Sequence, residues 1–369
     1  MVYLDHNATT PIDDRVLEAM LPFLKVFYGN PSSLYRHGRI VRSAIDTARE
    51  QIAALIGTQP PQIIFTSGGT EANNLALTAL KPGAKIAISA IEHPSITEPA
   101  ENLTSQGHEL KLLGVNKEGC VTQEAVDEIV RFRPDLTSIM LANNETGVIQ
   151  DITGYARQLN DQGILVHTDA VQALGKIPVD FARLGINMMT VSSHKIYGPK
   201  GCGALIVDKN VILRPILYGG GQEHGVRAGT ENVPAIIGFG KAAELAGLEL
   251  AQRTEHVLNL RKLLEEHLQS IPGIFIFGKE TDRLPNTVQF GLEGVDGEML
   301  LMKLDQKGMA VSSGSACASG GGKPSPVLAA MGVSAELAKS AIRISLGKDN
   351  TESDIMEFFN QLKSLVIPG

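Results

Sequence analysis

From residue 62 to residue 207, short apolar runs alternate with stretches in which apolar residues recur at helical spacing. The short runs predict buried strands at 63–65, 85–89, 109–113, 138–142, 164–167, 188–191 and 204–207. The helical spacing and the turn residues beside it predict helices at 13–24, 41–56, 72–80, 122–130 and 152–162. Strands that alternate with helices predict a mostly parallel sheet covered by helices on both faces.

The pattern changes after residue 240, where one long helix is expected at 241–270. Beyond it, strands are predicted at 274–277, 286–291, 309–312 and 342–346, and helices at 297–306 and 351–366. A chain of 369 residues is too long for one ordinary core. We therefore expect an α/β protein with a large domain of residues 15–240 and a small α+β domain of residues 1–14 and 241–369.

Polar side chains follow several of the apolar runs, and sites in parallel sheets gather at the carboxyl ends of strands. These side chains are Thr70, His93, Asn144, Asp169 and Lys195. A lone lysine at such a place is usually a solvated surface residue. Lys195, however, directly follows two serines and a histidine, and Asp169 lies at the end of the preceding predicted strand. A lysine that forms a Schiff base with an aldehyde cofactor requires such a set of neighbours.

The turn Ser67-Gly68-Gly69-Thr70 lies between a strand and a helix. Backbone N–H groups at a helix N-terminus, with hydroxyl groups beside them, favour an anion such as phosphate, although an ordinary turn is about equally plausible. The turn matches neither the Walker loop nor the dinucleotide fingerprint.

Asp169 either caps the next helix or faces a pyridine nitrogen, and Gln172 would face the same way one turn later. His93 is either a stacking partner or a proton shuttle, but a lone histidine is more often structural. Arg343 interrupts an apolar strand, and it either points to solvent or binds a substrate carboxylate. The segment at 227–230 has no obvious internal partner and could reach across a subunit interface.

Cys317 lies among small residues, so it is not expected to be a packed core cysteine. An exposed cysteine on such a loop is a candidate nucleophile. Cys120 and Cys202 are expected to be structural, and the three cysteines form neither a disulfide framework nor a metal-binding spacing.

The net charge of −7 argues against nucleic acid as the main partner. The N-terminal segment shows no secretory signal, and no apolar run approaches the length of a membrane span. We therefore expect a cytoplasmic protein that holds no metal.

The chain resembles the cysteine desulfurases of the NifS/IscS type, which are fold-type I pyridoxal-phosphate enzymes in the class V aminotransferase group. The resemblance covers essentially the whole chain. It rests on segments that occur in order at the family's spacing: 3–11 (YLDHNATTP), 29–33 (GNPSS), 66–71 (TSGGTE), 143–147 (NNETG), 193–201 (SHKIYGPKG), 227–230 (RAGT) and 312–317 (SSGSAC).

The resemblance implies a role for each matching residue. Lys195 would hold pyridoxal 5′-phosphate as an internal aldimine, Asp169 would pair with the pyridine nitrogen, and His93 would stack on the ring. Arg343 would bind the substrate carboxylate, with Asn144 beside it, and Cys317 would accept the sulfur. The remaining cofactor contacts would come from Gly69, Thr70, Asn144, Gln172, Ser192 and His194, with Thr230 reaching the phosphate from the neighbouring subunit of a homodimer.

The activity implied is conversion of L-cysteine to L-alanine, with a persulfide left on Cys317 for a sulfur acceptor such as an iron–sulfur scaffold. The loop that follows Cys317 is richer in glycine than is usual in the family, so we expect it to be poorly ordered. Two alternatives stay open. A carbon–sulfur or selenocysteine lyase would use the same lysine and cofactor without Cys317, and a non-catalytic interaction subunit would not need the lysine or the aspartate.

Overall fold

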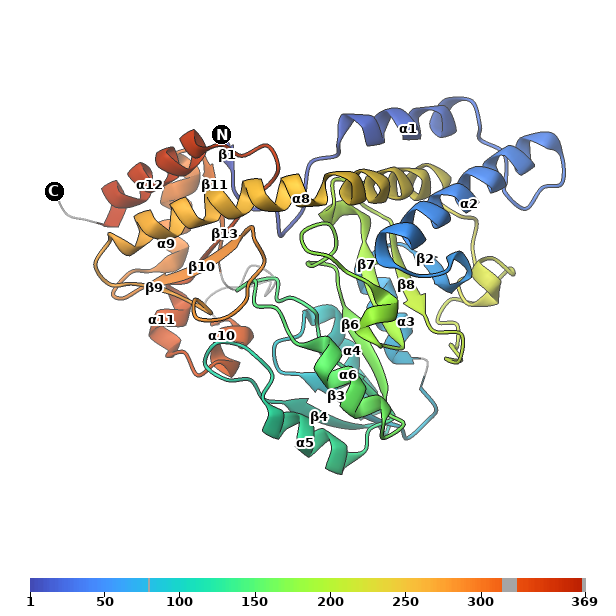
Figure 1. Cartoon of the computed structure of the whole chain (residues 1–369), viewed down its shortest axis with the longest axis horizontal. Helices are drawn as coiled ribbons and strands as arrows, with labels where there is room; N and C mark the ends of the chain where they lie inside the picture. The colour runs from blue at the N-terminus through green and yellow to red at the C-terminus, as the bar shows by residue number, and fades with distance from the viewer. Residues whose placement is uncertain (79, 314–323, 367–369) are drawn as a thin grey trace.

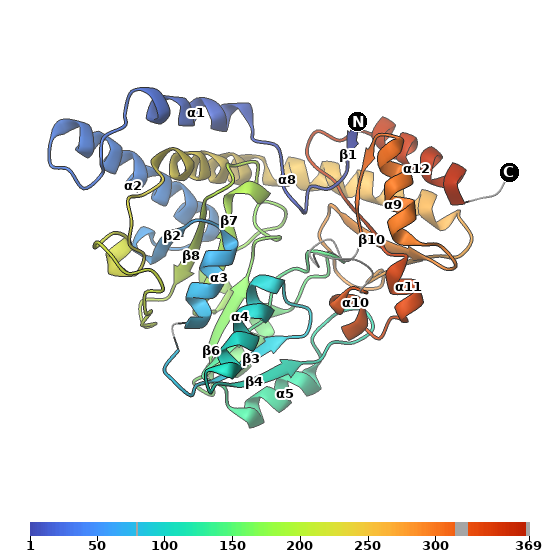
Figure 2. The same cartoon turned by 180° about the vertical axis from the view of Figure 1, so that it is seen from behind.

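The computed structural model describes residues 1–78, 80–313 and 324–366, and all structural statements below refer to these residues. They form a large α/β unit and a smaller α+β unit, with helix α8 (Val233–Gln269) running through both (Figure 1). Both ends of the described chain lie at the smaller unit, as the reverse view also shows (Figure 2). The predicted boundary after residue 240 falls inside α8, and the division into two domains stays a prediction.

The large unit is built on a seven-stranded sheet in the order β2-β8-β7-β6-β5-β3-β4. All neighbouring strands are parallel except β8, which runs antiparallel to both β2 and β7. The strands are β2 (Ile63–Thr66), β3 (Lys85–Ser89), β4 (Glu109–Leu113), β5 (Leu136–Ser138), β6 (Leu165–Asp169), β7 (Met188–Ser192) and β8 (Gly203–Val207). The predicted mostly parallel sheet is therefore confirmed.

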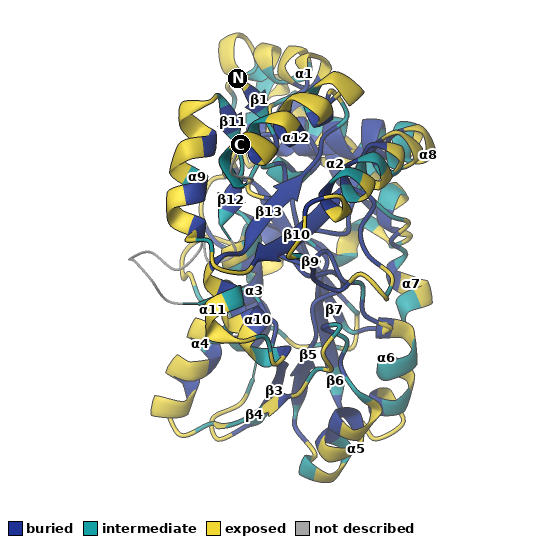
Figure 3. Ribbon diagram, turned by 90° about the vertical axis from the view of Figure 1, so that its left-hand side faces the viewer, coloured by how far each residue is buried: buried dark blue, intermediate teal, exposed yellow. Residues whose placement is uncertain are grey.

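Helices cover both faces of this sheet. One face packs against α2, α5, α6 and the first part of α8, and the other packs against α3 and α4. The helices of the large unit besides α8 are α1 (Asp14–Lys25), α2 (Arg36–Ile56), α3 (Gly69–Thr78), α4 (Pro94–Ser105), α5 (Gln123–Phe132), α6 (Ile152–Asn160) and α7 (Phe181–Leu184). Buried residues lie between these layers, and exposed residues lie on the outer faces of the helices (Figure 3).

The smaller unit has a four-stranded antiparallel sheet in the order β12-β13-β10-β9 and a parallel pair, β1 and β11. Its core also takes in the second part of α8. Its strands are β1 (Val2–Tyr3), β9 (Ile274–Ile276), β10 (Thr287–Leu292), β11 (Met309–Ala310), β12 (Ser312–Ser313) and β13 (Ile342–Ser345), and its helices are α9 (Gly297–Gln306), α10 (Pro326–Ala330), α11 (Ala335–Lys339) and α12 (Glu352–Val366).

Several element boundaries differ from those predicted. The long helix α8 begins at Val233, not at 241, and Gly238 and Gly240 lie within it. These glycines permit close packing, since a Cβ atom at Gly240 would lie only 2.6 Å from the Cβ of Ala48 on α2. The strand predicted at 138–142 is β5 at Leu136–Ser138, although the next residues still run beside β6, with Leu141 N–H donating to Asp169 O at 2.9 Å.

Candidate functional site

A cavity of about 500 Å³ opens at the carboxyl ends of β6 and β7, where the large sheet meets the smaller unit. Ten of the residues predicted from the sequence line it, namely Gly69, Thr70, His93, Asn144, Asp169, Gln172, Ser192, His194, Lys195 and Arg343. The structure thus brings together residues from both units, and the first and last of them, Gly69 and Arg343, are 274 positions apart. This is the arrangement expected of a site between two domains.

Lys195 ends a short 3₁₀ helix, Ser193–Lys195, that directly follows β7. Its Nζ atom donates hydrogen bonds to the carbonyl oxygens of Asn7, at 2.5 Å, and Ala8, at 2.8 Å. The N-terminal segment therefore forms one wall of the cavity and provides acceptors for this amino group.

Asp169 is the last residue of β6, and its two carboxylate oxygens have different partners. Oδ1 accepts a hydrogen bond from Val171 N–H at 2.9 Å, and Oδ2 accepts one from Asn73 Nδ2 at 2.7 Å. Asn73 Nδ2 also donates to Ser95 Oγ at 2.8 Å, and this hydroxyl contacts His93 Nδ1 at 2.8 Å. A continuous line of polar contacts thus joins the carboxylate to the imidazole.

Both histidines of the cavity favour the neutral form. Burial lowers the pKa of His93, Asp169 acts in the opposite direction, and the charge of Lys195 adds to the lowering. Burial lowers the pKa of His194 to about 4, and Lys195 and Lys200 contribute to this shift. At neutral pH each imidazole therefore offers one N–H donor and one acceptor.

The corner between β7 and α3 is suited to an anion. Gly69 and Thr70 form the first turn of α3, a helix of ten residues, so backbone N–H groups point out of its N-terminus. Ser192 is buried, and its Oγ atom has no hydrogen-bond partner within the described protein. A Cβ atom at Gly69 would lie 3.1 Å from Val171 Cγ2 and 3.8 Å from Ser192 Cβ, so glycine leaves this corner open.

Arg343 on β13 forms the opposite wall, and its side chain is only 4% exposed, which excludes the solvent-facing alternative. It forms an ion pair with Asp5 Oδ1 at 2.7 Å and donates to the carbonyl oxygen of Asn144 at 3.1 Å. Its Nε atom has no partner within the described protein. The register pairs Arg343 with Ser312, which also lines the cavity.

Two buried carboxyl groups stand beside the cavity. Burial raises the pKa of Glu92 to about 8, while hydrogen bonds from Ser89 Oγ and Met140 N–H oppose the shift. Burial likewise raises the pKa of Glu145 to about 7, against hydrogen bonds from Ser325 Oγ, at 2.6 Å, and Gln289 Nε2, at 3.3 Å. Both groups hold loops in place around the cavity.

Some predicted residues lie elsewhere. Thr230 is exposed and does not line this cavity, and Cys317 lies outside the described residues. The expectation that the segment at 227–230 lacks an internal partner is wrong, because Arg227 forms an ion pair with Glu71 on α3 at 2.8 Å. These two residues are 156 positions apart, so no local pattern could reveal the pair.

The sequence reasoning missed Asn7, Asn73, Ser95 and Lys176. Asn73 and Ser95 are buried polar residues within helices, where the sequence alone shows only a polar position. Asn7 contacts seven other residues by hydrogen bonds, with main-chain as well as side-chain atoms. The available signal was its place in the motif at residues 3–11.

Within the described residues, no three histidine, cysteine or acidic side chains converge in a way that could bind a metal ion. Across the same residues, none of the helices combines the length and the apolar character needed to cross a bilayer.

The family model for class-V aminotransferases matches residues 2–358. The chain is 43% identical to the cysteine desulfurase IscS of Dictyoglomus turgidum, over 99% of this chain and 94% of that protein. It is also 43% identical to the cysteine desulfurase IscS of Methanosarcina thermophila, over 96% of this chain and 89% of that protein. The solved structure of a NifS-like protein from Rickettsia africae superposes with a TM-score of 0.91, at 38% identity and 99% coverage of both chains. The chain thus belongs to the class-V aminotransferase family, within its group of IscS- and NifS-type cysteine desulfurases.

Proposed function

We propose that this chain takes the sulfur atom of L-cysteine onto Cys317, using pyridoxal 5′-phosphate held at Lys195, and releases L-alanine. The observation that carries the proposal is the convergence of Lys195, Asp169, His93 and Arg343 on one cavity between the two units. An amino group, a carboxylate, an imidazole and a guanidinium are the four groups that this cofactor and an amino-acid substrate require.

The residues present suit the cofactor. The first turn of α3 and the unpartnered hydroxyl of Ser192 would hold its phosphate, since helix N-termini and hydroxyl groups bind such anions. Asp169, held by Asn73, would face the pyridine nitrogen, and His93 would cover the ring. When bound, pyridoxal phosphate supplies an electron sink for the pair left behind when a proton leaves the substrate Cα.

The remaining steps belong to the residues of the chain. Arg343 binds the substrate carboxylate with its fork of N–H donors, and Asp5 holds that fork in orientation. Lys195 Nζ removes the Cα proton, and the carbonyl oxygens of Asn7 and Ala8 accept hydrogen bonds from it once it is charged.

Sulfur transfer follows as a balanced exchange. The Cys317 thiolate attacks the substrate sulfur, a new S–S bond forms, and the substrate C–S bond breaks. The electron pair of the broken bond stays with the substrate carbon skeleton, Cβ takes up a proton, Lys195 returns a proton to Cα, and the product leaves as alanine. The sulfur atom is thereby oxidised and the carbon reduced within one reaction, and a thiol acceptor later takes the sulfur from Cys317.

Product analysis of the wild-type protein and two variants tests the proposal. Wild-type protein should form alanine and a persulfide in equal amounts, and Cys317→Ser should lose at least a hundredfold in alanine formation while keeping the cofactor. Lys195→Ala should lose the absorbance of the lysine-bound cofactor. Pyruvate and free sulfide as the main products, or unimpaired turnover by Cys317→Ser, would instead favour the lyase alternative.

The proposed assembly is a cytoplasmic homodimer that passes sulfur to an acceptor such as an iron–sulfur scaffold. The exposed position of Thr230, outside the cavity of its own chain, supports a contribution to the site of a second copy. Thr230→Ala should therefore weaken cofactor binding, and mixed dimers with Lys195→Ala should show in which subunit the effect occurs.

A further inference from the structure

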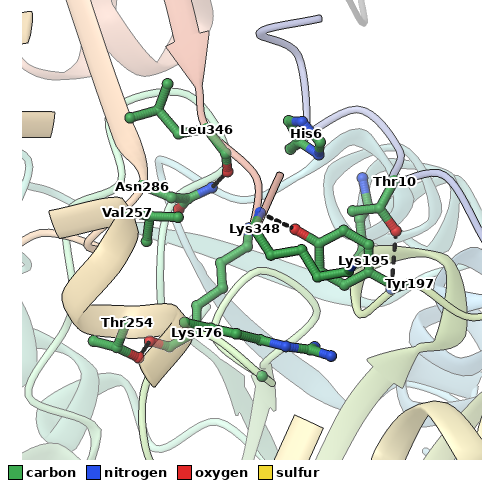
Figure 4. A pocket seen from close by; sticks show the side chains of 12 residues that line it. His6, Thr10, Lys176, Lys195, Tyr197, Thr254, Val257, Asn286, Leu346 and Lys348 are labelled. Atoms are coloured by element: carbon green, nitrogen blue, oxygen red, sulfur yellow. Dashed lines mark hydrogen bonds between the residues drawn. The ribbon is translucent and has the colours of Figure 1, made fainter. Parts of the chain in front are cut away.

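A second amino group lies behind Lys195. Lys176 is in the segment between β6 and β7, and its carbonyl oxygen accepts a hydrogen bond from Thr254 Oγ1 on α8 at 2.9 Å. The residue lines a small cavity of about 30 Å³ that Lys195 also lines, at the junction of the two units. Figure 4 shows the side chains of Lys176, Lys195 and Lys348 around this space.

Lys176 and Lys195 contact the same asparagine. Lys176 Nζ donates to Asn7 Oδ1 at 2.8 Å and to Gln172 Oε1 at 2.8 Å. Gln172 Nε2 in turn donates to Asn7 O at 2.9 Å, and this is the carbonyl oxygen that receives Lys195 Nζ. Lys176 therefore fixes both the side chain and, through Gln172, the main chain of Asn7.

The charge of Lys176 has no carboxylate partner in the described part of the chain, because its two acceptors are amide oxygens. Burial lowers the pKa of Lys176 far below its ordinary value, and the positive charges of Lys195 and Arg343 add to this effect. The other charged or titratable groups that face the small cavity are His6, Arg253, Lys348 and Tyr197. Arg253 is paired with Glu249, and Lys348 is paired with Asp13 and Asp349, so no acidic side chain that lines the small cavity would offset a positive charge on Lys176.

We propose that Lys176 is a positioning residue for the chemistry of Lys195. Lys176 holds the Asn7 carbonyl oxygen against Lys195 Nζ, and it opposes a further positive charge at Lys195 Nζ. This proposal rests on the proposed function, because it assigns Lys195 to the cofactor. It goes beyond that function by adding a residue that touches neither substrate nor cofactor and acts through Asn7 and through charge.

The test is a pH titration of the absorbance of the bound cofactor in the full-length holoenzyme. Lys176→Met removes the charge and both hydrogen bonds, Lys176→Gln removes the charge and keeps an amide donor, and Lys176→Arg keeps the charge. Lys303→Met, at an exposed lysine on α9, is the matched control.

Loss of the charge should raise the pH midpoint of the absorbance change by about one unit in both uncharged variants. Lys176→Arg and Lys303→Met should keep the wild-type midpoint. The KM for L-cysteine should rise severalfold in Lys176→Met, because Asn7 Oδ1 loses one of its two donors and keeps only Asn286 Nδ2. If only one of Lys176→Met and Lys176→Gln folds, the titration uses that variant. A pH midpoint equal to that of wild type overturns the proposal. A lower melting temperature with no change in the pH midpoint also overturns it. A wild-type protein that takes up no cofactor would instead contradict the proposed function.

Discussion

Asp5 and Arg343 form an ion pair of 2.7 Å in the wall of the cavity, although 338 positions separate them in the chain. The Arg343 side chain is 4% exposed and that of Asp5 is 20% exposed, so solvent screens the pair only weakly. Asp5 follows β1 and Arg343 lies on β13, so the pair ties the first residues of the chain to the smaller sheet. The N-terminal segment thereby fixes the position of the Arg343 guanidinium at the cavity.

Asp5→Asn should raise the KM for L-cysteine about tenfold with little change in kcat, which corresponds to about 1.4 kcal/mol. The amide keeps the shape of the carboxylate but no longer orients the guanidinium fork by charge. Steady-state kinetics measure the effect. Asp349→Asn, at an exposed aspartate paired with Lys348, is the control and should keep the wild-type KM. A loss confined to kcat would place Asp5 in a different step.

Asn73→Ala should weaken cofactor binding about tenfold or more, because a hydrogen bond to a charged group contributes about 1.5–3 kcal/mol. Asn73 holds the Asp169 carboxylate from one side and the Ser95 hydroxyl from the other. Equilibrium dialysis against pyridoxal phosphate measures the dissociation constant.

The neighbouring residue provides a matched control for this measurement. Asn74 Nδ2 donates only to the carbonyl oxygen of Thr70 among the contacts that the structure describes. Asn74→Ala should therefore bind the cofactor as wild type does, and equal weakening in both variants would show a general effect on α3.

The carboxyl ends of β6 and β7 could be predicted from the sequence to within about two residues, because polar residues follow their buried apolar runs. This pattern was sufficient to bring Asp169 and Lys195 to one place, since parallel strands end at the same edge of the sheet. The pattern could not show Asn73 or Lys176, because their importance comes from contacts with Asp169 and Asn7. Such contacts join positions 96 and 169 residues apart.

Helix propensity and capping patterns did not predict the helix boundaries that tertiary packing determines. Gly238 and Gly240 are poor helix formers, yet they lie inside α8 because only glycine lets it approach α1 and α2 so closely. Local capping rules were reliable where no such packing intervenes. Gly57 ends α2 with φ +64°, and Thr351 begins α12 by exchanging hydrogen bonds with Asp354.

Glu145→Gln should stabilise the protein at high pH and lose this advantage as the pH falls. In the folded protein the pKa of Glu145 is raised to about 7 from 4.5, so the unfolded chain loses this proton first as the pH rises. Wild-type stability therefore falls as the pH rises through this window and is constant above it. Glutamine accepts the same hydrogen bonds and does not titrate.

Denaturant unfolding of both proteins between pH 5 and about pH 8 measures this difference. Glu92 titrates in both proteins, so its contribution cancels in the comparison. Glu124→Gln, at an exposed glutamate, should show a difference from wild type that does not vary with pH. If the advantage of Glu145→Gln were the same at every pH, Glu145 would not be the group that holds the proton.

Ser192→Ala should change apoprotein stability and cofactor affinity in opposite directions. The Ser192 hydroxyl is buried with no partner in the described protein, and removing such a group should stabilise the apoprotein by about 1–3 kcal/mol. If the hydroxyl binds the phosphate, the same variant should bind pyridoxal phosphate about tenfold more weakly. Melting temperatures of the apoprotein and dialysis of the cofactor separate the two effects.

Ser193→Ala is the matched control for this prediction. The Ser193 hydroxyl is also buried without a partner in the described residues, but it faces Gly198, where a Cβ atom would lie 2.1 Å from it, and Ser193 does not line the site cavity. Its removal should stabilise the apoprotein without weakening cofactor binding. Weaker binding in both variants would show that the 3₁₀ turn before Lys195 had shifted, whereas weaker binding in Ser192→Ala alone identifies its hydroxyl as a phosphate ligand.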